Sequence, residues 1–360
     1  MKSFLSHNKK LHLWLLANLI LLAAFFALRN FRTVMDFYTL SVADPLVALL
    51  RCVTALVPFS VAEALCVLLA LDVLAFLVFA VVYTLRAEKK RAAVYSLALT
   101  LLCSALTVYT AFCWLWGVYY YTDRFYEQSA LTAEKISVDE LYAVTERFAE
   151  KLIAADAAVP RDENGRVDAS REDILDAANG IYASLYGEFP FLEQGNEPIK
   201  PIYFSRAMSY IGFTGFYCPF TGESNVNMDS PIASLPTTCV HELSHRRGVA
   251  TEQECNFLGI RAAAESSDIV YRYSGCLTGY IHLSNALYGV DREKWQALYD
   301  TLPDTVISDF RFSNAYWAQF EGPARETSDA VYDGFLKSYG NELGLRSYGA
   351  CVDLLVAYYK

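Results

Sequence analysis

The sequence predicts an α+β protein, mostly helical, that three N-terminal helices hold in a membrane. Three observations support this prediction. Long apolar runs fill the first third of the 360 residues, charged segments with helical spacing follow from Asp123, and residues 202–227 combine Tyr, Phe and Gly in the pattern of short strands and turns. We therefore expect a membrane anchor at 1–121, a helical lead-in at 122–200 and a further domain at 201–360.

Three apolar runs are long enough to cross a hydrocarbon core of about 30 Å. They are residues 11–28, 61–85 and 92–121. The first run could instead be a cleaved signal peptide, but no clear small-residue cleavage site precedes Arg29, so we expect it to remain as an anchor. The lipid bilayer is thus the first expected partner.

A fourth apolar stretch, Asp44 to Pro58, differs from these three. Arg51 interrupts it and Pro58 closes it, which favours an interfacial or re-entrant helix over a span. A fourth crossing would invert the side on which the rest of the chain lies.

Basic residues set the expected orientation. Lys2, Lys9 and Lys10 precede the first run, and four more Lys and Arg lie at 86–91, so both places should be cytoplasmic. Three crossings then place everything after Tyr121 outside the cytoplasm. We expect a multi-pass protein of the cytoplasmic (cell) membrane with an extracytoplasmic C-terminal domain.

The two parts differ in charge. Residues 1–121 carry ten Lys and Arg against five Asp and Glu, a net charge of +5, whereas the remainder carries twenty against thirty-five, a net of −15. Nucleic-acid binding requires a clustered basic surface. An acidic domain therefore argues against a nucleic-acid partner.

The segment His241-Glu242-Leu243-Ser244-His245 is the clearest chemical signal. On a helix, residues four apart share one face, so His241 and His245 can each give a nitrogen to the same Zn²⁺. Glu242 then points toward a zinc-bound water as its general base. With five His in the chain, a random HExxH match is on the order of one in a hundred, so we predict a zinc site.

A catalytic zinc needs a third protein ligand. The metzincin pattern would require His at 251, where this chain has Thr251. Glu254-Cys255-Asn256 resembles the Glu-Ala-Asp/Asn signature of gluzincin-type membrane peptidases, which favours Glu254 as the ligand. The alternative is a capping box of Thr251 and Glu254, which would leave Glu252 as the ligand.

Three segments resemble a bacterial family of membrane-anchored, zincin-like proteins catalogued as a domain of unknown function. They are FYCPFTGESNVN from Phe216, HELSHRRGVATEQECNF from His241 and DGFLKSYGNELGLRSYG from Asp333. The resemblance covers nearly the whole chain and implies N-terminal spans, then a zincin-like domain with strands, the HExxH helix and further helices.

These observations predict a membrane-anchored zinc-dependent metallopeptidase that hydrolyses peptide bonds through a Zn²⁺-bound water activated by Glu242. His282 and Tyr273 are candidate donors to the oxyanion. The strand segment 216–227 could bind an extended peptide or protein substrate at its edge, or could be a structural hairpin.

One alternative is a non-catalytic envelope protein in which zinc staples helices, or in which the spans serve an interaction role. Intramembrane proteolysis is disfavoured, because Arg246 and Arg247 follow the motif and no apolar run of spanning length contains it.

Overall fold

The structure is a computed structural model that describes residues 8–123, 125–129, 131, 136–339 and 351–360. Lys2 and residues 340–349 of the C-terminal family-like segment lie outside the described residues. The chain is mostly helical with a small three-stranded sheet, which confirms the expected class. It forms two compact units: Met1–Leu50, Val61–Asp123 and Pro219–Thr221 make the first, and Arg51–Ser60, Arg124–Cys218 and Gly222–Lys360 make the second.

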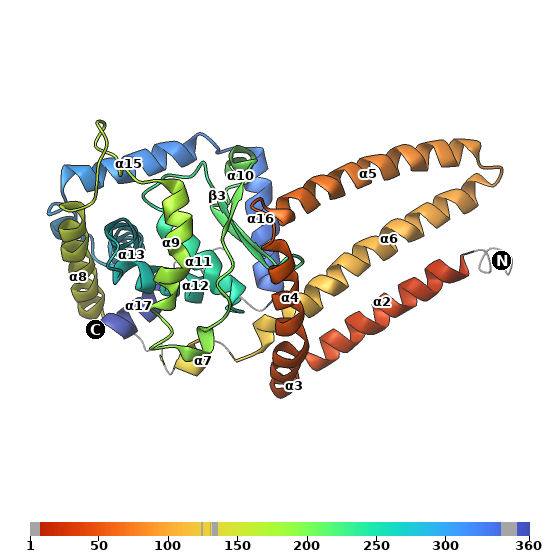
Figure 1. Cartoon of the computed structure of the whole chain (residues 1–360), viewed down its shortest axis with the longest axis horizontal. Helices are drawn as coiled ribbons and strands as arrows, with labels where there is room; N and C mark the ends of the chain where they lie inside the picture. Colours follow the sequence, from red (N-terminus) through yellow and green to blue (C-terminus); the bar gives the residue numbers. More distant parts are fainter. Residues whose placement is uncertain (1–7, 124, 130, 132–135, 340–350) are drawn as a thin grey trace. The chain divides into compact units, whose positions relative to one another are not determined.

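The first unit consists of long apolar helices (Figure 1). Its elements are α2 (Lys9–Leu28), α3 (Arg32–Tyr38), the π-helical turn η1 (Thr39–Ala43), α4 (Asp44–Thr54), α5 (Val61–Arg86), α6 (Lys90–Leu115) and η2 (Gly117–Tyr121). α2 lies along α6, and α5 and α6 form a helical hairpin. α4 begins in this unit and its last turn belongs to the second.

Four helical stretches of the described chain are long and apolar enough to cross a membrane. Three of them, Lys9–Leu28, Val61–Arg86 and Lys90–Leu115, correspond to the predicted runs. The fourth, Arg32–Thr54, joins α3, η1 and α4 and contains most of the stretch for which an interfacial helix was predicted. The structure thus supports association with a membrane.

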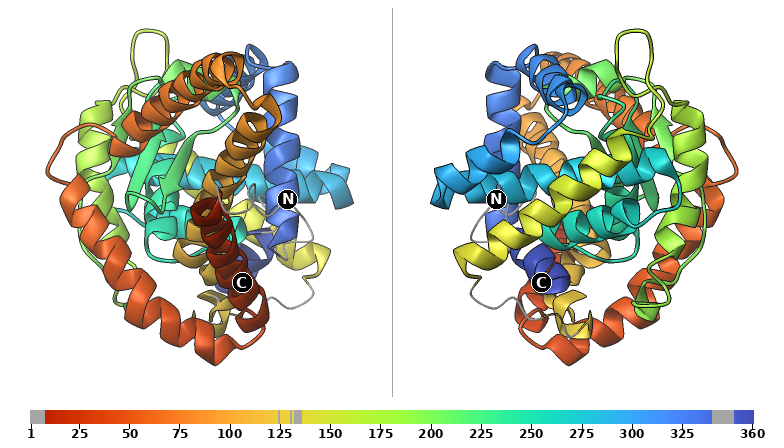
Figure 2. Two further views of the ribbon diagram at one scale, coloured as in Figure 1. Left: turned by 90° about the vertical axis from the view of Figure 1, so that its right-hand side faces the viewer. Right: turned by 90° about the vertical axis from the view of Figure 1, so that its left-hand side faces the viewer.

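The second unit packs helices around one hydrophobic core. Its helices are α7 (Phe125–Ser129), α8 (Val138–Asp156), α9 (Arg171–Ala183), η3 (Pro190–Leu192), α10 (Ser205–Tyr210), α11 (Leu235–Arg246), α12 (Glu252–Ala264), α13 (Ile269–Val290), α14 (Arg292–Tyr299), α15 (Asp304–Ala318), α16 (Pro323–Ser338) and α17 (Cys351–Tyr359). α8 packs along α13 (Figure 2). A capping box of Ser137 and Glu140 begins α8, as this sequence pattern favours.

The sheet has the strand order β1-β3-β2. β1 (Lys200–Ile202) pairs parallel to β3 (Glu223–Asn227), with Lys200 opposite Asn225. β2 (Gly215–Cys218) pairs antiparallel to β3, with Gly215 opposite Val226. β3 is buried along its whole length, whereas β2 is an edge of the sheet.

α11 is the central helix of the second unit. It contacts β2 and β3 as well as α9, α12 and α13. The hydroxyl of Ser224 on β3 donates a hydrogen bond to the Glu242 carbonyl, 2.8 Å away. The sheet therefore holds the middle of α11 in place.

Segment Arg51–Ser60 belongs to the second unit although it precedes α5 in the sequence. The ammonium of Lys200, 2% exposed, donates a hydrogen bond to the Val57 carbonyl. The Ser60 hydroxyl lies 2.6 Å from Asn225 Oδ1 and donates to it. The boundary near residue 121 therefore does not separate the two units completely.

Candidate metal centre

α11 is bounded by residues that favour a helix start and a helix stop. Pro236 stands in its first turn, where a missing N–H costs nothing. Gly248 follows its end with a φ of 81°, and the N–H of Val249 bonds back to the Ser244 carbonyl at 3.2 Å. This turn reverses the chain and brings the first turn of α12 over the HExxH residues.

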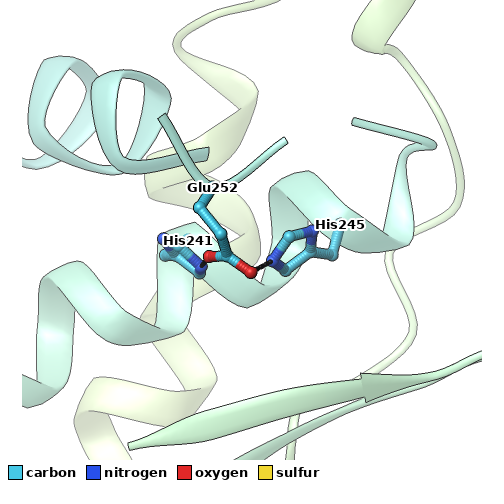
Figure 3. A group of neighbouring side chains, drawn as sticks. All are labelled: His241, His245 and Glu252. Atoms are coloured by element: carbon cyan, nitrogen blue, oxygen red, sulfur yellow. Dashed lines mark ion pairs between the residues drawn. The ribbon is translucent and has the colours of Figure 1, made fainter. Parts of the chain in front are cut away.

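Two imidazoles and one carboxylate meet at this point (Figure 3). His241 Nε2 lies 3.2 Å from Glu252 Oε2, and His245 Nε2 lies 3.6 Å from Glu252 Oε1. The three ligand atoms lie within 4.8 Å of one another, and all three side chains are largely buried. Both histidines come from α11, and Glu252 reaches between them from α12.

Hydrogen bonds on the far side of each ring decide which nitrogen faces the cluster. His245 Nδ1 is 2.9 Å from the Val249 carbonyl, which only accepts, so Nδ1 carries the proton. His241 Nδ1 is 2.9 Å from Asn256 Oδ1, an arrangement that likewise places the proton on Nδ1. In the neutral rings both Nε2 atoms then offer lone pairs to a metal, the usual outer-shell support of a histidine ligand.

Glu242 lies beside this cluster under the edge strand. A Cβ added to Gly215 would come within 2.6 Å of Glu242 Oε1, so only glycine leaves room for this carboxylate. Burial raises the pKa of Glu242 to about 7, although positive charge on His241 and His245 would lower it. Its Oε2 atom is buried and makes no hydrogen bond within the described part of the chain.

The third ligand is the point at which the structure departs from the preferred prediction. Glu254 points to Thr251, whose hydroxyl donates to Glu254 Oε2 at 2.5 Å. The Thr251 side chain forms no cap bond to the α12 backbone, so Thr251 and Glu254 do not make the complete capping box. Because Glu252 faces both histidines, the geometry favours the alternative ligand, Glu252, over Glu254.

Tyr332 is a site residue that the sequence did not indicate. It lies on α16, and its hydroxyl donates a short hydrogen bond to Glu252 Oε1. Its ring packs edge-on against Phe213, just before β2. Tyr332 is one of 25 tyrosines, 80 residues from Glu252, and no local pattern distinguishes it.

The two predicted oxyanion donors lie in different surroundings. The Tyr273 hydroxyl donates to Asp309 and accepts from Arg161 Nη2 at 3.0 Å, so it serves another polar cluster. His282, on α13, is close enough to His241 for their charges to interact, and burial together with that charge lowers the pKa of His282 to about 4. The structure thus leaves His282 as a candidate and argues against Tyr273.

The residues present fit a zinc ion. Two nitrogen donors and one carboxylate converge, a set typical of Zn²⁺ sites in hydrolases. Glu252 Oε2 is buried and makes no hydrogen bond among the described residues, so this carboxylate has capacity for a cation. Burial would raise the pKa of Glu252, but the two imidazoles that face it hold this pKa well below its usual range before any metal binds, so the carboxylate is ionised.

Comparison with models of protein families identifies the family of this chain. No curated protein and no solved structure matches the chain. A family model described as "Protein of unknown function (DUF3810)" matches residues 38–356, which include α4, both α5 and α6, and the whole candidate metal centre. The chain therefore belongs to this family of proteins of unknown function.

Proposed function

We propose that this protein is a membrane-anchored zinc metallopeptidase. The observation that carries the proposal is the convergence of His241, His245 and Glu252 beside a buried Glu242 under a strand edge. Zinc bound by these three residues would supply a Lewis acid that acidifies a water molecule and polarises a peptide carbonyl. The expected fold of such a domain is zincin-like.

Glu242 has the position required of the general base. Its unbonded Oε2 atom can take a proton from the attacking water, whose oxygen adds to the peptide carbonyl carbon. The same carboxyl then gives that proton to the leaving amine nitrogen as the C–N bond breaks. Tyr332 orients Glu252 through its hydrogen bond, and His282 remains the candidate donor to the carbonyl oxygen.

β2 offers a place for the substrate backbone. Within the described sheet this strand has a neighbour on one side only, so its other edge presents backbone groups to an added strand. The face of β2 at Gly215, from which a Cβ would project, lies against Glu242. An extended peptide paired to β2 would therefore pass over the general base.

The test is peptide hydrolysis by the full chain in detergent. The full chain is needed because Val57 and Ser60 complete hydrogen bonds of the second unit. Because the substrate is unknown, the assay uses a proteome-derived peptide library, and mass spectrometry identifies the cleaved peptides. We expect bound zinc in the wild type and in Glu242→Gln, with hydrolysis reduced about 10²–10⁴-fold in the variant, the usual contribution of a general base.

Glu254→Gln is the matched control, since it removes a carboxylate two residues from Glu252 that faces Thr251. It should retain both zinc and most activity. Absence of zinc from the wild type would refute the proposal. Zinc with no Glu242-dependent cleavage anywhere in the library would replace it with the structural-zinc alternative.

A further inference from the structure

α4 differs from the other apolar helices in having two unlike faces. Leu46, Leu49 and Val53 follow one another at helical spacing and are 42%, 62% and 58% exposed. On the opposite face Val47, Arg51 and Thr54 are buried. By contrast, the apolar window of α5 has no buried residue at all. A helix that exposes one apolar face and packs its other face, with polar residues, against protein is typical of the membrane surface rather than the membrane interior.

The polar face of α4 is bound to the second unit. Arg51 Nε lies 2.7 Å from Glu197 Oε2, and the Glu197 carbonyl accepts from Arg246 Nη1 at 2.5 Å. Arg246 directly follows the metal-binding candidate His245. The end of α4 is therefore on the same side of the membrane as the second unit, and a spanning position for Arg51 would be costly.

The start of this helical stretch lies on that same side. Three hydrogen bonds join α2 and the residue after it to α6 and η2, and the residue numbers of both partners increase from one bond to the next. The pairs are His12 with Tyr95, Asn18 with Thr107, and Arg29 with Tyr121. The two helices therefore run parallel and end at the same membrane surface. Since α6 leads through η2 toward the second unit, α2 also ends on the side of that unit.

Segment Arg51–Ser60, which belongs to the second unit, is linked to the candidate metal site. Ser60, the residue before α5, bonds to Asn225 on β3, and the neighbouring Ser224 bonds to Glu242. At about 3.8 Å between successive Cα atoms, these few links within the second unit place Glu242 on the order of 15 Å from Ser60. If segment Arg51–Ser60 lies at the membrane surface, polypeptide within reach of the site is polypeptide next to the bilayer.

We propose that α4 lies flat in the lipid headgroup boundary and holds the metal site beside the membrane, so that only α2, α5 and α6 cross. Leu46, Leu49 and Val53 contact lipid on the side that carries the second unit. If the protein is the proposed peptidase, this position of α4 also determines its substrate class, namely juxtamembrane segments of membrane-anchored polypeptides. The substrate class therefore rests on the proposed function.

The membrane position is tested without any activity measurement. In the full chain with the accessible Cys52, Cys66 and Cys218 replaced by Ser, single cysteines at Asn30, Pro58 and Glu88 react with an impermeant maleimide in sealed vesicles. We expect Asn30 and Pro58 to react from one side and Glu88 from the other. Reaction of Asn30 and Pro58 from opposite sides would show that the stretch spans, and would overturn the proposal.

Depth measurements with spin labels give a second, independent readout. Labels at Leu46, Leu49 and Val53 should report equal, shallow depths. A spanning α4 would instead separate Leu46 from Val53 by about 10 Å, at 1.5 Å per residue. Leu65 and Val73 on α5 provide the positive control, because a true span must show such a gradient.

The substrate class is tested in proteoliposomes with the best peptide from the library. The peptide is supplied free, or anchored to lipid through a spacer of about four or about forty residues. We expect the short-spacer form to be cleaved at least tenfold faster than the free form by the wild type, and this preference to be lost in Leu49→Glu/Val53→Glu while free-peptide cleavage is kept. Val290→Glu, at an exposed valine of α13, is the charge control.

Equal cleavage of free and anchored peptide would overturn the substrate class. Failure of the peptidase itself is distinguishable, since no form of the peptide would then be cleaved, and the labelling and depth results would still decide where α4 lies.

Discussion

Two buried charged clusters in the second unit are built on opposite plans. In the first, Arg161 Nη2 bonds to Asp156, to Tyr273 and to Asp309. This cluster contains its own permanent cation, which joins the α8 end to α13 and α15. Such an arrangement holds the three helices together, and its charges are balanced without a bound ligand.

The second cluster has carboxylates without a permanent cation. Glu242 and Glu252 are both buried, each with an Oε2 atom that makes no hydrogen bond among the described residues, and the basic groups between them are two imidazoles. Buried ionised groups are normally paired or bound to metal. The comparison supports the proposal that a cation from solution completes the HExxH cluster, whereas the Arg161 cluster already contains its own cation.

The largest expected difference between the clusters is in metal content. His245→Ala removes a nitrogen ligand, so zinc should fall from about one per chain to background, as measured by mass spectrometry of the purified protein. EDTA should lower the Tm of the wild type, because zinc stabilises the state that binds it, and should leave the Tm of His245→Ala unchanged. Equal zinc in both proteins would mean that the comparison is mistaken.

Arg161→Met should have the largest effect on stability without loss of zinc. It leaves the buried carboxylate of Asp309 and the largely buried one of Asp156 without their cation, which costs about 3–5 kcal/mol in the free energy of unfolding. Arg206→Met, in an exposed pair with Asp229, should cost about 1 kcal/mol or less. Chemical denaturation of the solubilised chain measures both. A zinc loss in Arg161→Met without unfolding would indicate that the clusters are coupled.

Glu252→Gln and Glu254→Gln sharpen the choice of third ligand. Only Glu252 faces both histidines, so its substitution should weaken zinc binding by more than about 100-fold, because loss of a direct ligand costs more than the loss of an outer-shell partner. Glu254→Gln should change zinc affinity little. Competition with a chelator of known affinity measures the dissociation constants, and the reverse order would restore Glu254 as the ligand.

Asn256→Ala should give the smallest effect. Its amide oxygen fixes the His241 ring through Nδ1, so its loss should weaken zinc binding by about 10-fold. Asn179→Ala, whose side chain bonds to Arg246 and to backbone carbonyls away from the histidines, is the matched control. The same chelator competition serves here, and unchanged affinity in Asn256→Ala would show that His241 is oriented by other contacts.

Local patterns predicted the parts of this protein that depend on local spacing. The apolar runs and the shared face of His241 and His245 follow from local spacing alone. The choice between Glu252 and Glu254 does not, because both stand in the first turn of α12. Which one faces α11 depends on the reversal at Gly248, a tertiary feature.

Contacts between segments far apart in the chain could not be predicted, because no local pattern in the sequence indicates them. Tyr332 reaches Glu252 from α16, and Arg51 pairs with Glu197 from within an apolar stretch. Hydropathy could suggest that Asp44–Pro58 was unlike a span, since Arg51 interrupts it. It could not show that the last turn of α4 packs with a unit made largely of residues beyond 124.

The hydrogen bonds of segment Arg51–Ser60 also constrain the order of folding. Val57 and Ser60 leave the ribosome 143 and 165 residues before Lys200 and Asn225, their partners. Contacts of such separation form late, after the intervening chain has been made and its loop closed. Here the closed loop contains the whole α5–α6 hairpin. Completion of the second unit must therefore await synthesis of that hairpin, and until Asn225 has been made the buried site of Lys200 stays incomplete.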